Sequence, residues 1–102
     1  MKHTKSMYYN PSEESRELFL YTVNDGYLYE SQVLPIVNNL RKKAKKGIYD
    51  SNKAIDYYYM LATSASEKYF KDFGYKFNVT DRYTTAVDLE KYYREDHVFY
   101  EL

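Results

Sequence analysis

The sequence contains no cysteine and no tryptophan, and its 102 residues include only three glycines, two prolines and two histidines. A chain without cysteine has no disulfide framework, no cysteine-based zinc site and no thiol nucleophile. Three glycines are too few for a glycine-rich loop around a phosphate. The two histidines, His3 and His97, lie near the two ends of the chain, where we expect terminal arms and no catalytic site. These shortages argue against an enzyme and against a bound cofactor.

One group of residues has the side chains of a metal site. His97 follows directly after Glu95 and Asp96. Adjacent residues on a helix point in different directions, so the three side chains share one ion only if the helix has already ended. We therefore interpret this group as solvated charge near the end of a helix and predict no metal site.

The chain also lacks an excess of either charge and lacks any long apolar run. Fifteen basic and fifteen acidic residues cancel, which argues against a dominant electrostatic attraction to nucleic acid or to an anionic membrane. No run approaches the ~20 apolar residues that a membrane-spanning helix needs, and the first fifteen residues lack the apolar stretch of a signal peptide. We expect one domain in the cytoplasm, with no membrane contact.

Tyrosine is the residue that the sequence has in excess, with fifteen copies beside five phenylalanines. In one interpretation these rings fill the rim of a small hydrophobic core. In the other they form a contact surface, because tyrosine offers a rigid, amphipathic area at low entropic cost. Composition alone does not decide between the two.

The longest segment with a helical period is 50–73. With about 100° per residue from Ala54, its apolar side chains form one stripe: Ile55, Tyr58, Leu61, Ala62, Ala65 and Tyr69. Asp50 is a suitable N-cap for this helix, and Gly74 is a suitable residue to end it in the left-handed conformation. This segment is therefore the expected axis of the fold.

Three further helices are predicted around this axis. The first begins at Asn10, an N-cap candidate followed by Pro11 at the first helical position and by Glu13 three residues after the cap. The second, 27–46, has an apolar stripe of Tyr29, Val33, Ile36, Val37, Leu40 and Ala44, with Pro35 on the opposite side. The last begins with Thr80 or Asp81 as its cap and has a stripe of Ala86, Leu89 and Tyr93.

The predicted fold is therefore all-α, a compact bundle of about four helices in a single domain spanning 1–102. The helices cover 10–24, 27–46, 50–73 and 80–95. Residues 1–9 are expected to form a loose arm, and the apolar tail 97–102 is expected to pack back or to contact another chain. An α+β alternative remains, because the apolar residues before Asn24-Asp25-Gly26 also suit a β-hairpin at 18–30.

Two groups of residues are candidates for contact with a partner. The first consists of aromatic and apolar side chains outside the predicted core stripe: Tyr57, Tyr59, Met60 and Tyr92. The second is the only dense charge cluster: Arg41, Lys42, Lys43, Lys45 and Lys46. These five cations are either a solvated face that complements the helix dipole or a phosphate-binding patch.

Spaced anchors along the chain carry a resemblance to a known group of proteins. They are Asn24-Asp25-Gly26-Tyr27-Leu28-Tyr29, Pro35-Ile36-Val37-Asn38-Asn39-Leu40, Gly47-Ile48-Tyr49-Asp50, Ala54 and Phe73-Gly74, with a Tyr-Tyr pair near the end. Their order resembles that in a group of small helical proteins carried by bacteriophages and prophages, over roughly 18–93. The resemblance implies an accessory protein of a mobile element that acts inside a bacterial host, and it implies no catalytic residues.

Two functions follow as expectations. In the first, the protein binds and blocks a host protein, for example a nuclease of a restriction or CRISPR-type defence system, by steric occupation. In the alternative, it binds nucleic acid through the cationic patch 41–46. A homodimer through the side of Tyr59 and Phe70 is a third arrangement that the sequence allows.

Overall fold

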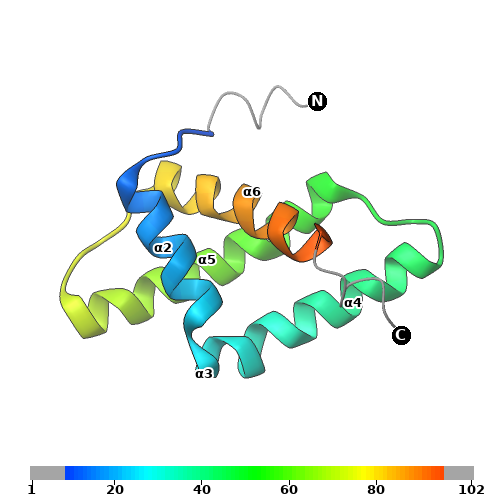
Figure 1. The fold of residues 1–102 in the computed structure, drawn as a ribbon, viewed down its shortest axis with the longest axis horizontal. Coiled ribbons are helices and arrows are strands. Elements are labelled where there is room, and N and C mark those ends of the chain that lie inside the picture. The colour runs from blue at the N-terminus through cyan, green and yellow to red at the C-terminus, as the bar shows by residue number, and fades with distance from the viewer. Residues whose placement is uncertain (1–8, 96–102) are drawn as a thin grey trace.

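The computed structural model of the chain describes residues 9–95, and every regular element in that range is helical (Figure 1). The elements are α2 (Glu13–Asn24), α3 (Gly26–Leu28), the π-helical segment η1 (Tyr29–Val33), α4 (Leu34–Lys45), α5 (Ser51–Phe73) and α6 (Val79–Glu95). Because α3, η1 and α4 follow one another without a loop, the bundle has four main helical rods. The all-α prediction is confirmed, and the alternative hairpin at 18–30 is wrong.

The four rods form a flat molecule with extents of 41 × 32 × 17 Å. Helix α6 packs along α5 over the most extensive contact of the fold, and α2 packs on both of them (Figure 1). The rod that begins with α3 leaves the end of α2, crosses near α5 and ends far from α2. The predicted tail 97–102, and the predicted arm 1–9 apart from Tyr9, lie outside the described residues. Within 9–95, no helix combines the length and apolar character of a membrane span.

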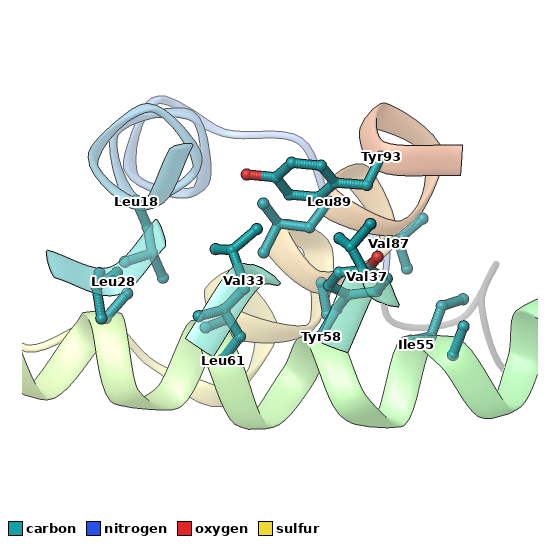
Figure 2. Close-up of a cluster of buried hydrophobic side chains, with 14 of the residues drawn as sticks. Leu18, Leu28, Val33, Val37, Ile55, Tyr58, Leu61, Val87, Leu89 and Tyr93 are labelled. Atoms are coloured by element: carbon teal, nitrogen blue, oxygen red, sulfur yellow. The ribbon is translucent and has the colours of Figure 1, made fainter. Parts of the chain in front are cut away.

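Side chains from all four rods meet in one hydrophobic core (Figure 2). The stripe predicted for α5 is buried, except that Tyr69 is only partly buried. The stripe predicted for α6 is buried as well, but α6 also buries four consecutive residues, Thr84 to Val87. A helix can bury consecutive residues only when neighbours cover more than one of its sides, and both α5 and α2 cover α6.

The second rod contains one turn of π-helix, Tyr29–Val33, where the regular period predicted α-helix. The backbone N–H of Leu34 donates to the carbonyl oxygen of Tyr29, five residues earlier, instead of the usual four. The next residue is Pro35, which lacks an N–H and whose ring would clash with the carbonyl of residue 31 in a regular α-helix. A wider turn before the proline relieves this conflict.

This π turn changes which residues of the rod face the core. In a regular α-helix, Leu28 and Val33 would point to nearly opposite sides, because five residues advance the helix by about 500°. Here the wider turn brings both to the same side, and they are 1% and 0% exposed. Tyr29, which the α-helical period placed in the apolar stripe, is instead 41% exposed. The assignment of Tyr29 to the core stripe was wrong, because the π turn changes the number of residues per helical turn at this point.

Two helix starts differ from the prediction. Helix α2 begins at Glu13, where the Ser12 hydroxyl oxygen accepts from the N–H of Ser15 at 3.1 Å and the Ser15 hydroxyl oxygen accepts from the N–H of Ser12 at 3.0 Å. This capping box replaces the predicted cap at Asn10, whose N–H donates to the Thr84 hydroxyl at 2.8 Å and so binds the preceding segment to α6.

Helix α6 begins at Val79, and its cap, Asn78, lies two residues before Thr80 and three before Asp81, the two predicted caps. The side-chain oxygen of Asn78 accepts from the N–H of Asp81 at 2.7 Å, so Thr80 and Asp81 belong to the first turn. Both predicted ends of α5 are confirmed. Asp50 accepts from the N–H of Asn52, and Gly74 adopts φ 76°, the left-handed conformation that ends the helix.

Candidate functional site

The predicted contact residues on α5 do not share one environment. Met60 is 65% exposed and Tyr57 is 37% exposed, so both are available on the outer side of the helix. The ammonium nitrogen of Lys43, on α4, lies 5.9 Å from the centre of the Tyr57 ring. The structure therefore places one predicted partner residue beside the predicted basic patch.

Tyr59, by contrast, is largely committed to an internal contact. Its hydroxyl accepts from the Nη2 of Arg82 at 3.1 Å, and the guanidinium carbon lies 5.7 Å from the ring centre. Arg82 also donates to the carbonyl oxygen of Phe77 at 2.8 Å. This tyrosine fastens α5 to the start of α6, and a partner would reach only its uncovered edge. Phe70, suggested for a homodimer, is 44% exposed.

Tyr92 lies in a different place, in a groove of about 790 Å³ between α2 and α6. It is 48% exposed, and its ring packs edge-on against Phe19 of α2 at 5.4 Å. The groove wall also includes Asp88, which accepts a hydrogen bond from Tyr9 at 2.9 Å. Tyr92 packs against α2, whereas Tyr57 lies beside Lys43 of α4. The four predicted contact residues therefore do not form one surface.

The five predicted cations form what we call the basic end, residues 41–46 at the C-terminus of α4. Lys42, Lys45 and Lys46 are exposed, and Arg41 donates to Asn38 at 3.5 Å. Within residues 9–95, no carboxylate lies within 4 Å of any of the five cations. In the described part of the chain, their charge is complemented by the C-terminal end of the α4 dipole.

A further surface, missed by the sequence analysis, lies where α2 meets the end of α5. Five aromatic rings from α2, α5 and the following loop pack in a chain of contacts: Tyr21, Tyr69, Phe73, Tyr75 and Phe77. Neighbouring ring centres in this chain are 4.7 to 5.0 Å apart. Such distances are typical of stabilising aromatic pairs, and most of the pairs meet edge to face.

Two shallow hollows open on this aromatic cluster, with volumes of about 410 and 350 Å³. Both are lined by Tyr69 and Glu17, and the Tyr69 hydroxyl donates to a Glu17 carboxylate oxygen at 3.5 Å. Glu13 and Glu14 stand at the first hollow, and Phe73 stands at the second. We call the pair of hollows the acidic–aromatic groove.

The residues of this groove stand out in the sequence, but their proximity in the fold does not. The three glutamates at the start of α2 are explained equally well by the helix dipole, and Tyr69 fits the core stripe of α5. Nothing in the period of either helix indicates that α2 lies beside the loop after α5. Recognising the groove requires the tertiary arrangement.

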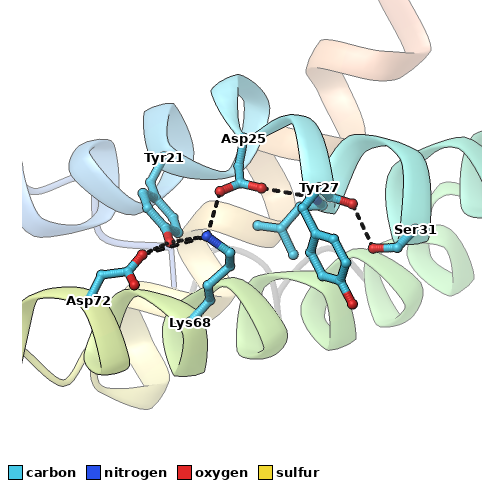
Figure 3. Close-up of polar contacts among 7 residues, drawn as sticks. Tyr21, Asp25, Tyr27, Ser31, Lys68 and Asp72 are labelled. Atoms are coloured by element: carbon cyan, nitrogen blue, oxygen red, sulfur yellow. Dashed lines mark hydrogen bonds and ion pairs between the residues drawn. The ribbon is translucent and has the colours of Figure 1, made fainter.

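Next to the groove, Lys68 of α5 is held by three groups of α2, α5 and the turn between α2 and α3 (Figure 3). Its ammonium nitrogen lies 2.9 Å from Asp25, 3.1 Å from the Tyr21 hydroxyl and 3.5 Å from Asp72. The hydrogen bond from Lys68 lowers the pKa of the Asp25 carboxyl, and the same bond raises the pKa of Lys68. We interpret this cluster as a lock between helices.

A buried carboxylate forms a second lock. Glu90 of α6 is 2% exposed, and its Oε2 accepts from the Tyr49 hydroxyl and from Nε of Arg94, both at 2.7 Å. Burial, together with the hydrogen bond to Glu90, raises the pKa of Tyr49. Because the carboxylate has both a cation and a phenol as partners, it ties the α4–α5 loop to α6.

Most anchors of the phage-protein resemblance lie at helix boundaries. Asp25 caps α3, Asp50 caps α5, and Gly47 and Gly74 have positive φ angles of 75° and 76° at turns. Such positions restrict which residues can stand there, because a cap needs a short acceptor and a positive φ favours glycine. In this structure these anchors stand at turns and helix ends.

Within residues 9–95, no group of three or more acidic or histidine side chains is placed to hold a metal ion. His3, His97 and Asp96 lie outside the described residues, so the trio around His97 is not described. Comparisons with protein-family models, curated proteins and solved structures found no match.

Proposed function

We propose that this chain is a small, non-enzymatic binding module of a phage or prophage that occupies a bacterial host protein and blocks it. A nuclease of a restriction or CRISPR-type defence system is the expected target. The motif resemblance is the reason for assigning it to a mobile element. The exposed side chains are the reason for proposing binding.

One observation carries the proposal. Among residues 9–95, twelve large hydrophobic side chains are exposed, and eight of them are aromatic: Tyr9, Tyr27, Tyr29, Tyr57, Phe70, Phe73, Tyr75 and Tyr92. Isolated exposed apolar residues are ordinary, but here several gather beside charged groups, as in the acidic–aromatic groove. Rigid rings next to charges are typical of the contact residues of protein interfaces.

The test is inhibition of purified defence nucleases at rising ratios of this chain to enzyme. Steric occupation predicts inhibition that is complete near one chain per binding site and that reverses on dilution. A chain that acts catalytically on its target would inhibit at a small fraction of that ratio. A panel of nucleases that all cleave normally at a large excess of the chain would contradict the proposal.

A second function, nucleic-acid binding, has its own supporting observation. The basic end presents three exposed lysines without a carboxylate neighbour in the described region, and Tyr57 lies beside Lys43. Cations that contact phosphates next to a ring that stacks on a base are the usual parts of a single-strand binding surface. Binding to phosphates should weaken steeply as the salt concentration rises, and this dependence can be measured.

If the exposed lysines Lys42, Lys45 and Lys46 each neutralise one phosphate, the logarithm of the binding constant for single-stranded DNA should fall with the logarithm of the salt concentration with a slope of about −2. Fluorescence anisotropy of labelled DNA measures this slope. K45E should flatten the slope by about one, whereas K71E, at the other end of α5, should leave it unchanged. No binding at low salt would exclude this second function.

A further inference from the structure

The chain itself shows how its surface holds an ammonium group. Lys68 places its nitrogen 5.4 Å from the centre of the Tyr21 ring and within reach of the carboxylates of Asp25 and Asp72 (Figure 3). The ring attracts the cation through its electron-rich face, and the carboxylates attract it by charge. An aromatic ring flanked by carboxylates is therefore a receptor for a cationic side chain at this surface.

The acidic–aromatic groove repeats this combination with other carboxylates, and its second hollow adjoins the Lys68 site, because Tyr21 and Asp25 also line that hollow. One hollow sets Glu13 and Glu14 beside Tyr75, and the other sets Glu17 beside Phe73. Within residues 9–95, no lysine or arginine nitrogen lies within 4 Å of these three glutamates. Lys68, the nearby cation, is already bound to Asp25 and Asp72.

The exposure of the groove agrees with a receptor and not with a closed core. Phe73 is 65% exposed, Tyr75 is 45% exposed and Leu20, at the second hollow, is 42% exposed. Burial, and after it the charges of Glu14 and Asp81, raise the pKa of Tyr75, so negative potential reaches the ring. The surface thus combines uncovered apolar area with carboxylates that form no ion pair in the described part of the chain.

We infer that the acidic–aromatic groove receives a cationic segment of the partner protein, with one arginine or lysine side chain in each hollow. The Glu17–Tyr69 pair separates the two positions. The apolar rim packs against the methylene stems of the incoming side chains while the carboxylates face their charged ends. Arginine is favoured over lysine, because its planar guanidinium group stacks on aromatic rings and can donate two parallel hydrogen bonds to one carboxylate. This inference rests on the proposed function, because it names the chemistry of the segment that docks.

A second copy of the chain is the competing occupant. The basic end of α4 carries the complementary charge and lies across the molecule from α2 (Figure 1). Its insertion into the groove of a neighbour would give a head-to-tail contact, which grows into rings or filaments. Sedimentation of the chain alone separates this case from a foreign partner.

The test is fluorescence anisotropy of labelled helical peptides that are rich in alanine and carry two arginines, at spacings of one and of two helical turns. A glutamine peptide of the same length is the uncharged control. We expect the purified chain to bind at least one arginine peptide about tenfold more tightly than the glutamine peptide. E17K and F73A should each weaken this binding about tenfold, whereas E30K, the same charge change outside the groove, should not.

Three results would overturn the inference. They are equal binding of arginine and glutamine peptides, a loss in E30K as large as that in E17K, and self-association of the free chain that E17K abolishes. The peptide titration uses the purified chain alone, and nuclease inhibition needs no peptide. A chain that inhibits a nuclease without binding the peptides therefore retains the proposed function and loses this inference.

Discussion

Tyr49, which is partly buried in the α4–α5 loop, and Tyr58, which is buried in the core, differ in how their hydroxyls are paired. Tyr49 donates its hydroxyl to the buried Glu90 at 2.7 Å. Tyr58 is 0% exposed, and its hydroxyl has no hydrogen-bond partner among the described residues. A buried polar group without a partner costs free energy, whereas a paired one contributes to stability. The same residue type is therefore favourable at one position and unfavourable at the other.

Removing the two hydroxyls should change the stability in opposite directions. We expect Y58F to raise the free energy of unfolding by about 1 kcal/mol, because it removes an unpaired buried hydroxyl. Y49F should lower it by about 1 to 2 kcal/mol, because the Glu90 carboxylate loses a donor. Urea denaturation monitored by circular dichroism measures both changes. A destabilised Y58F would show that the hydroxyl has a partner in solution.

The Asp25 carboxylate should make the free energy of unfolding decrease as the pH falls into the acidic range. Its pKa is lowered from 3.8 in the folded protein, first by the hydrogen bond from Lys68. A group whose pKa is lower in the folded state stabilises the fold above its unfolded pKa, and this stabilisation is lost as pH falls through the folded pKa.

D25N tests this dependence, since asparagine retains the cap of α3 and removes the charge. We expect D25N to be about 1 kcal/mol less stable than wild type at neutral pH, a modest value because Lys68 is partly exposed to solvent. The difference should shrink as pH falls below about 4. A difference that stays constant from neutral to acidic pH would show that the charge is not the cause.

A constant helical period predicts the buried residues of α5 correctly, but it does not do so for the rod that follows α2. The α5 stripe from Ile55 to Ala65 is buried as predicted, because an unbroken helix keeps a constant angle per residue. The π turn before Pro35 breaks that constancy, so the buried residue is Leu28 and not Tyr29. The acidic–aromatic groove could not be predicted for another reason. Its residues come from α2, α5 and the loop after α5, and the period of a single helix does not show which segments pack together.

The π turn predicts an unusual tolerance to deletion. Removing Glu30 should convert the turn to regular α-helix, with Leu28 and Val33 then four residues apart and still on one face. We expect this variant to keep cooperative thermal unfolding. Removing Glu67, which is also exposed, should rotate the end of α5 by about 100° and cost at least about 2 kcal/mol. Equal damage from both deletions would contradict the role assigned to the π turn.

At the scale of the whole molecule, a net charge of zero conceals two separate surfaces of opposite sign. The basic end of α4 has no carboxylate within 4 Å in the described region, and the glutamates of the acidic–aromatic groove have no cation within that distance. Charges that are left without partners contribute little to folding, and they are available to steer an encounter with another molecule. The molecule therefore offers surfaces for contact, and its charged clusters near the core serve as locks.

The most direct test of action by contact is the plating efficiency of a susceptible phage on cells with an active defence nuclease that also produce this chain. We predict that the wild-type chain protects the phage and that the double histidine variant H3A/H97A protects it equally. E17K, with an unchanged circular dichroism spectrum, should protect at least about tenfold less well. Protection that disappears with the histidines and persists in E17K would contradict action by surface contact.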